Sequence, residues 1–517
     1  MVHMFKLLIL LFFMLALAAC GNGQVQPLDM EESSSINEID YVPELMMADQ
    51  DLLPDVPQHD TYIVTLDVDP QARTVDGISR IVFTNRSGQP LEQIVLRSFL
   101  NAFEEGAYPR PYPTHLIHRM KYHGEERGFM TFMYASLNNE TLEYSIDGTV
   151  VTLKFDEPLE PYATINIILQ YSAYVPMLGH SIGGNEYAMW FGMFLPVIAV
   201  HGHYGWHTEE FYPVTRPFFL ETANYRVDIT TPARYMVVGT GQRTEEMLED
   251  TRITTFAGDM IRDFAFAVLS SYYNMASAET ESGVEINFYY HSEIASRRAN
   301  EILHIARISM EHFEYRVGLY AFPQINIVEA NLLYNSMPFS QMVFLDMNNY
   351  GSHTGLSRSL ASQWFSGIVG VNRIYEPWLD TGLSHFVQAG IVNDTPELLR
   401  NHIELERQTA ARREGLSLSD GLWVYANRNH YIDVHGRAAS VMLYELMQLM
   451  GEEYFWKFIN LYYQTFAFKI ATANDFISLA EEVHGRSLQT FFQGWLEGTP
   501  LAFAEVVIPQ DTEEDGQ

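Results

Sequence analysis

The densest group of potential metal ligands in the sequence lies in one short segment. Its imidazoles are those of His201, His203 and His207, and the carboxylates of Glu209 and Glu210 follow directly. Side chains two positions apart on a strand share a face, so His201 and His203 could chelate one ion together. Imidazole pairs of this kind hold zinc or copper. A polar loop between strands is the more common reason for such a segment, so metal binding here is the lesser alternative.

A longer stretch, Leu356 to Gly390, has apolar residues at the spacing of a helix, a short loop and a second helix. The first expected helix contains Gln363-Trp364-Phe365, and the second begins with Trp378-Leu379-Asp380-Thr381-Gly382. These motifs resemble the zinc-binding core of the aminopeptidase N family, the M1 family of gluzincin metallopeptidases. In that family the first helix carries His-Glu-x-x-His before Gln-Trp-Phe-Gly. The second opens with Trp-Leu-Asn-Glu-Gly, whose Glu is the third zinc ligand.

The spacing of the motifs fixes how this chain corresponds to the family. The family leaves eighteen residues between the second His and the Glu, and the same eighteen, 363 to 380, separate Ser362 from Thr381. The resemblance therefore puts Arg358, Ser362 and Thr381 at the zinc-ligand positions and Ser359 at the general-base Glu. Zinc requires neutral imidazole, thiolate or carboxylate ligands, whereas Arg is permanently cationic. We expect no zinc, no other cofactor and no catalytic residue here.

A second degenerate motif precedes this stretch. Asn335-Ser336-Met337-Pro338-Phe339, between two predicted strands, resembles the family's Gly-x-Met-Glu-Asn strand, whose Glu binds the free amino terminus of the substrate. Pro338 occupies the place of that Glu. Proline offers no side-chain acceptor to an ammonium group and lacks a backbone donor. The resemblance thus implies that this chain lacks the Glu with which an aminopeptidase of the family binds the amino terminus of its substrate.

A third degenerate motif follows the zinc-binding stretch. The helical run that starts near Asp433 resembles the family's closing helices, the first of which begins with Tyr-x-Lys-Gly. That Tyr stabilises the oxyanion of the family's reaction, whereas positions 433 to 436 read Asp-Val-His-Gly here. A carboxylate beside a developing oxyanion would raise the barrier. Tyr431, two residues upstream, could replace the family's Tyr only if the loop shifts.

The resemblance also predicts a substrate-binding cleft at these positions, lined by Met337, Phe339, Arg358, Asp380, Tyr431 and Asp433. A guanidinium buried there is costly without a partner, so we expect Arg358 to lie within about 4 Å of a carboxylate. The candidates are Asp433, Asp380 and Glu376. The alternative is that Arg358 faces the cleft, stays solvated and meets a ligand carboxylate.

Strands and helices must hold these positions in place. From Thr61 to about Ser270, alternating segments such as 62–68 are separated by Asp, Pro, Gly and Asn turns, which predicts strands. From about Gly283 helical spacing appears, as in 294–315. Residues 61 to 502 resemble the family's domains. The expected fold is multidomain α+β, with an N-terminal β-sandwich at 61–275 and a mainly helical thermolysin-like domain at 276–505.

The first twenty residues are typical of a bacterial lipoprotein signal peptide. The apolar run from Leu7 to Ala19 is shorter than the about 20 residues that cross a bilayer and is typical of a secretory signal. Leu17-Ala18-Ala19-Cys20 resembles the lipobox at which such chains are cleaved and acylated on the Cys. We expect an extracytoplasmic protein, lipid-anchored to the bacterial cell membrane. A disordered acidic tether at 21–60 and a disordered tail at 506–517 complete the expected organisation.

Composition and charge limit the classes of function. The chain has 517 residues, too many for one hydrophobic core. Its single cysteine, Cys20, cannot form a disulfide within the chain. The formal net charge of −34 argues against a general nucleic-acid surface and for a solvated, mutually repelling exterior.

Three functions remain open from the sequence. The favoured one is a lipid-anchored pseudopeptidase that binds peptides or a protein partner without zinc-dependent hydrolysis. The second is an active zinc metallopeptidase with an unusual site, for which only the cluster of His201, His203 and His207 speaks. The third is an accessory subunit of a membrane transporter complex, by analogy with relatives of this fold.

Overall fold

The structure is a computed structural model that describes residues 59–104, 127–138, 140–291, 296–346, 353–393, 395–413 and 415–497. The predicted signal peptide with Cys20, the tether up to residue 58 and the predicted tail lie outside these residues. None of the helices in the described ranges combines the length and the apolar character needed to cross a bilayer.

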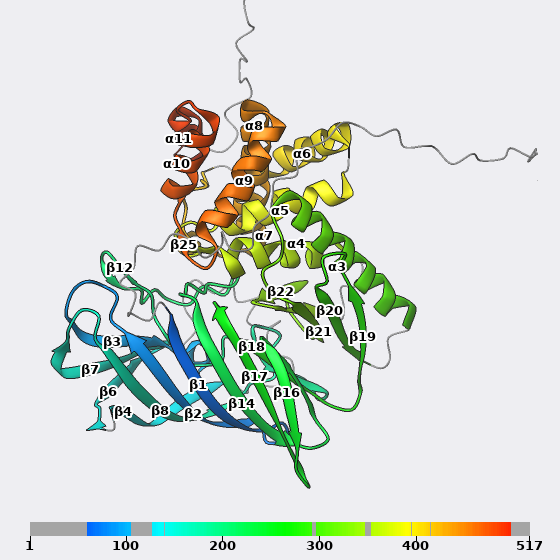
Figure 1. Cartoon of the computed structure of the whole chain (residues 1–517). Helices are drawn as coiled ribbons and strands as arrows, with labels where there is room; N and C mark the ends of the chain where they lie inside the picture. The colour runs from blue at the N-terminus through cyan, green and yellow to red at the C-terminus, as the bar shows by residue number, and fades with distance from the viewer. Residues whose placement is uncertain are drawn as a thin grey trace, which may run out of the picture. The chain divides into compact units, whose positions relative to one another are not determined.

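The alternating segment after residue 60 forms a long strand, β1 (Asp60–Asp69), in which buried and more exposed side chains alternate. Tyr62, Val64 and Leu66 are buried, because successive side chains on a strand point to opposite faces. β1 is central in an eight-stranded sheet (Figure 1). In spatial order the strands are β16 (Gln242–Met247), β17 (Thr251–Ile261), β14 (Ala223–Pro232), β1, β2 (Thr74–Thr84), β8 (Thr164–Tyr174), β4 (Phe129–Leu137) and β5 (Glu140–Thr141).

Two four-stranded sheets complete most of this β-rich part. One has the order β11 (Val197–Ile198), β3 (Leu91–Arg97), β7 (Val150–Leu159) and β6 (Tyr144–Asp147). The other has the order β15 (Met236–Gly239), β18 (Ala265–Leu269), β10 (Ala188–Gly192) and β9 (Ile182–Gly184). Every residue of β10 and β18 is buried, and Phe191 and Phe266 stack with ring centroids 4.2 Å apart. The remaining elements are η2 (Phe99–Phe103) and the hairpin of β12 (His201–Gly202) and β13 (Gly205–Trp206).

A five-stranded sheet begins the second part of the chain. Its order is β19 (Tyr273–Glu279), β20 (Glu285–His291), β21 (Gln324–Ala330), β23 (Met342–Asp346) and β22 (Ser336–Phe339). The helix predicted at 294–315 is α3 (Ser296–Arg316), which links the parallel strands β20 and β21 and packs on β19 and β20. β22 pairs antiparallel with β23 at the sheet edge, where Pro338 can lie opposite Val343. The expected boundary at 275/276 falls inside β19.

Helices form most of the remaining structure (Figure 1, yellow to red). The expected helix–loop–helix is α4 (His353–Ser362), which continues as the π-helical segment η3 (Gln363–Ile368), and α5 (Trp378–Val392). After these come α6 (Pro396–Ala410), η4 (Leu422–Val424), α7 (Arg428–Tyr431), the π-helical η5 (Ile432–Ala438), α8 (Ala439–Met450), α9 (Glu452–Phe466), α10 (Ala473–His484) and α11 (Gln489–Leu496). Two short strands, β24 (Gly370–Val371) and β25 (Ile470–Ala471), pair in parallel.

The start and end of α10 follow directly from its sequence. Thr472 and Asp475 form a capping box, in which each side chain accepts a hydrogen bond from the other residue's backbone N–H. Gly485 closes the helix in the left-handed conformation, at φ 75°. The expected multidomain α+β fold, a β-rich region followed by a mainly helical one, is thus confirmed.

Candidate functional site

Most of the degenerate positions meet around one cavity of about 260 Å³. β22, α4, α5 and α7 supply its walls, together with the loop before β22 and residues 215 and 216. Of the expected cleft residues, Met337, Arg358, Asp380 and Tyr431 line it. Pro338, Ser359 and Thr381 line it too, so segments far apart in the sequence converge as the family resemblance implied.

The motif Gln363-Trp364-Phe365 is structural in this chain. The Oε1 atom of Gln363 accepts hydrogen bonds from the Gln341 backbone N–H at 3.0 Å and the Tyr320 hydroxyl at 3.1 Å. Its Nε2 atom donates to the Phe339 carbonyl at 3.0 Å. Because the amide is 2% exposed and satisfied on both sides, it ties the end of α4 to the end of β22.

Hydroxyl groups form hydrogen bonds with one another at the positions where the family has two of its zinc ligands and its general base. Ser362 Oγ lies 3.2 Å from Ser384 Oγ, and Thr381 Oγ1 lies 2.6 Å from the Tyr431 hydroxyl. Ser359 Oγ, at the general-base position, lies 2.7 Å from Ser336 Oγ. Neutral hydroxyls and a guanidinium do not fit zinc. No group of three or more His, Cys, Asp or Glu in the described ranges is placed to hold a metal ion.

The prediction that Arg358 forms an ion pair with one of three nearby carboxylates is wrong. Its Nε atom donates to Gln388 Oε1 at 3.1 Å, and none of the ion pairs of the described residues joins it to Asp433, Asp380 or Glu376. Other groups already occupy those three carboxylates. Arg413 and Arg437 hold Asp433, Arg373 holds Asp380, and the Ala473 backbone N–H donates to Glu376.

The cavity is cationic at neutral pH. Burial lowers the pKa of Arg358 to about 10, as do Arg437 and Arg428, while Glu406 opposes the shift. Arg358 therefore keeps its charge near pH 7. Burial, followed by the neighbouring Arg358, lowers the pKa of His385 well below its usual value, so this imidazole is neutral.

Two expected cleft residues, Phe339 and Asp433, lie outside the cavity lining. Phe339 is 1% exposed, and its ring packs against Phe344 with centroids 5.4 Å apart. Asp433 is 2% exposed and its two oxygens face Arg413 and Arg437. Tyr431 lines the cavity instead. Its hydroxyl is protonated, because burial raises its pKa.

The histidine cluster does not converge on one point. The His201 ring packs edge-on against Trp206, its partner across the β12–β13 hairpin, at 4.8 Å. His203 packs against Tyr204 at 4.9 Å. His207 Nδ1 lies 2.6 Å from Glu209 Oε1, which fixes that imidazole on a neighbouring carboxylate. Each of the three imidazoles thus has a different neighbouring side chain, and His201 lies on a strand of a short hairpin.

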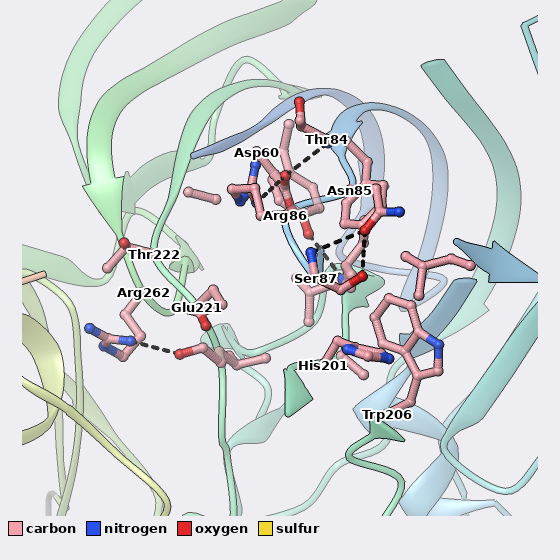
Figure 2. A pocket seen from close by; sticks show the side chains of 18 of the residues that line it. Asp60, Thr84, Asn85, Arg86, Ser87, His201, Trp206, Glu221, Thr222 and Arg262 are labelled. Carbon is pink, nitrogen blue, oxygen red and sulfur yellow. Dashed lines mark hydrogen bonds and ion pairs between the residues drawn. The ribbon is translucent and has the colours of Figure 1, made fainter. Parts of the chain in front are cut away.

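Sequence reasoning missed a second cavity, of about 180 Å³, in the β-rich part. Figure 2 shows Arg86 directed at Asp60 in this cavity, and the two form an ion pair at 2.6 Å. Arg262 lies on another wall and donates to the Leu220 carbonyl at 2.7 Å. His201 also lines it. No local motif marks these residues, which come from segments far apart in the sequence.

Comparisons with known proteins agree with this fold and site. Residues 356–495 match the peptidase family M1 domain. Aminopeptidase N of Streptomyces lividans is 27% identical over 170 residues, which are 30% of this chain and 19% of that protein's length. This chain thus matches about a fifth of that relative.

Solved structures are similar over most of the chain. The M1 zinc metallopeptidase from Deinococcus radiodurans has a TM-score of 0.64 at 15% identity, covering 87% of this chain and 96% of its own. A mutant of that enzyme bound to a Tyr-Ser-Ala substrate has the same score and identity, covering 86% and 96%. A two-domain M1 zinc metallopeptidase bound to L-tryptophan has a TM-score of 0.60 at 14% identity, covering 86% and 97%. Residues 356–495 therefore match the peptidase family M1 domain, and the two-part fold of the chain resembles that of M1 zinc metallopeptidases.

Proposed function

We propose that this protein is a pseudopeptidase, which binds peptides or a protein partner without zinc-dependent hydrolysis. The donor set at the three zinc-ligand positions carries the proposal. Arg358 has no lone pair to offer a metal, and the hydroxyls of Ser362 and Thr381 already face those of Ser384 and Tyr431. A zinc site needs imidazole, thiolate or carboxylate ligands instead.

The rest of the family's chemistry is missing at the same cavity. A general base must accept a proton near neutral pH, and Ser359 is a hydroxyl that faces another hydroxyl. Pro338 brings no carboxylate to the position that holds a substrate's amino terminus. The cavity itself remains at about 260 Å³, close to the lower end of ligand pockets at about 300 Å³. Loss of the reactive groups with retention of the space supports binding without turnover.

Zinc binding tests the proposal most directly. After dialysis against zinc, we expect the wild-type chain to retain far less than about one equivalent, because its donors do not fit the metal. Reporter aminoacyl and peptide substrates should remain uncleaved. The matched control restores the family's residues with Arg358→His, Ser359→Glu, Ser362→His and Thr381→Glu, and should retain about one equivalent. Stoichiometric zinc in the wild type, or hydrolysis that a chelator abolishes, would contradict a pseudopeptidase.

Peptide binding can be measured with the tripeptide Tyr-Ser-Ala, the substrate found with the mutant of the Deinococcus radiodurans enzyme. We expect calorimetry to detect binding to the wild type, and mass spectrometry to recover the tripeptide intact after long incubation. Free tyrosine among the products would show catalysis. Absence of binding at millimolar concentration would reject a peptide ligand.

We also propose that the protein is exported and anchored by a lipid on Cys20. The support is Leu17-Ala18-Ala19-Cys20 after an apolar run, together with the absence of any other cysteine that could be acylated. Cys20→Ser should remove labelling by an alkyne fatty acid and release the protein from the membrane fraction. Ser34→Ala, a substitution in the predicted tether, is the matched control. Unchanged membrane association of Cys20→Ser would overturn the anchor.

A further inference from the structure

The charged side chains that line the cavity of about 260 Å³ are mainly positive. Arg216, Arg358 and Arg428 line it, whereas Asp380 is its one carboxylate among the described lining residues. Asp380 is already engaged, because Arg373 donates to it and Arg216 lies 3.8 Å away. The cavity is therefore a positive region in a chain whose net charge is −34. Such a region attracts anions.

Two of these arginines have donors to spare. Arg358 uses only Nε, on Gln388, so both of its terminal nitrogens are without a hydrogen-bond partner among the described residues. Arg428 donates Nη1 to the Val214 carbonyl at 3.2 Å, and its guanidinium lies over the Tyr334 ring at 4.2 Å. Neither forms an ion pair with a carboxylate of the described residues. A planar guanidinium held in this way offers a pair of parallel N–H groups that suits a carboxylate.

The wall around Pro338 offers an ammonium group no carboxylate from the described lining residues. Pro338 stands where the family has an acidic residue, and its carbonyl accepts a hydrogen bond from Arg216. The side chains nearest it on the lining, Ser336 and Met337, are neutral. A free amino terminus would thus meet three guanidinium groups and, among the described lining residues, a single carboxylate, that of Asp380, which already contacts Arg373 and Arg216. The site has the opposite preference from one built to hold an amino terminus.

We infer that the cavity binds a peptide through a carboxylate, held between Arg358 and Arg428, rather than through its amino terminus. This inference rests on the proposed peptide binding without hydrolysis. The carboxylate comes from the C-terminus of a short peptide or from an acidic side chain. Because charge-assisted hydrogen bonds contribute most when both partners are shielded from water, losing the carboxylate should weaken binding by about tenfold or more.

The experiment measures the affinity of the full chain for four related peptides by calorimetry. They are Tyr-Ser-Ala, its C-terminal amide, its N-acetyl form, and N-acetyl-Tyr-Glu-Ala amide, which carries only a side-chain carboxylate. We expect the amide to bind about tenfold more weakly or worse and the N-acetyl form to bind as well as the parent. Recovery of affinity with the Glu peptide would support a side-chain source, and no recovery would support the C-terminus.

Two variants place the effect on the named residues. Arg358→Gln and Arg428→Gln should each weaken binding of Tyr-Ser-Ala by about tenfold without further weakening its amide. Arg226→Gln is the matched control, since Arg226 is an exposed arginine on β14 outside the cavity. Circular dichroism checks that each variant folds. If a variant does not fold, the four peptides on the wild type still decide.

The opposite pattern of affinities would overturn the inference while leaving the proposed function in place. In that pattern, acetylation abolishes binding and amidation has no effect. Failure of all four peptides to bind would instead reject peptide binding itself, and the inference with it. The zinc and turnover assays would still judge catalysis separately.

Discussion

Two arginines with similar electrostatics play opposite parts in this molecule. Burial lowers the pKa of both Arg262 and Arg358 to about 10. The guanidinium of Arg262 donates to four backbone carbonyls, those of Leu220, Gly367, Ile368 and Lys469. Among the described residues, Arg358 has one side-chain hydrogen-bond partner, Gln388. A desolvated guanidinium whose three nitrogens all donate to the protein holds the fold together, whereas one with nitrogens left over is available to a ligand.

Removal of Arg262 should have the largest effect. Arg262→Met would remove one hydrogen bond from each of four carbonyls, and we expect a loss of about 3–5 kcal/mol in the free energy of unfolding. Urea denaturation followed by fluorescence measures it. Arg226→Met, at an exposed site on β14, is the control and should change stability by less than about 0.5 kcal/mol. If the two substitutions changed the free energy of unfolding equally, the hydrogen bonds of Arg262 would not be what stabilises the fold.

The carboxylate that was expected to serve Arg358 supplies the second test. Asp433→Asn should destabilise the protein by about 1–3 kcal/mol, less than for a fully buried pair because Arg413 and Arg437 are about 30% exposed. A double-mutant cycle should show coupling of Asp433 with Arg413 and almost none with Arg358. Strong coupling between Asp433 and Arg358 would restore the ion pair that the structure lacks.

Acid should probe the charge of the cavity. Because burial and then Arg358 hold the pKa of His385 below its usual 6.5, the unfolded chain takes up a proton that the folded chain refuses. The stability from this group is complete above pH 6.5 and falls as pH drops below it, by up to about 1.4 kcal/mol per pH unit. Arg358→Met removes one cationic neighbour of His385. The folded-state pKa of His385 should therefore rise, and less stability should be lost as the pH falls. If the free energies of unfolding of the wild type and of Arg358→Met fall in parallel with pH, Arg358 does not shift the pKa of His385.

The smallest expected effect is that of Arg358→Met on stability at neutral pH. The substitution loses one hydrogen bond to Gln388 and relieves repulsion from Arg428 and Arg437. We expect the free energy of unfolding to change by at most about 1 kcal/mol in either direction. Thermal unfolding beside Arg262→Met measures the contrast. A loss as large as that of Arg262→Met would mean that Arg358 is a structural residue.

Local patterns in the sequence predicted much of the fold and part of the site. Period-two alternation predicted β1, and helical spacing at 294–315 predicted α3. The eighteen-residue spacing between the two motifs placed Arg358 and Thr381 at neighbouring positions of one site, and both residues line one cavity in the structure. Such features depend on residues close in the chain or on a preserved motif, which is why they can be recognised without coordinates.

The partners of the charged residues could not be predicted in this way. Arg413, which holds Asp433, lies beyond the end of α6 in a segment with no motif. The turn that carries Asp433 is π-helical, η5, rather than α-helical. A π-helix is wider, so it changes which side chains share a face. Tyr431, the last residue of α7, lines the cavity, whereas Asp433 in η5 does not.

Arg262 also has a consequence for how the molecule comes apart. It follows β17, in the β-rich part, yet Gly367, Ile368 and Lys469 belong to the helical part. A β-rich fragment cut off near residue 275 would keep a desolvated cation and lose three of its four acceptors. The two parts should therefore melt in one cooperative transition, and limited proteolysis should not release the N-terminal part as a stable, autonomous body.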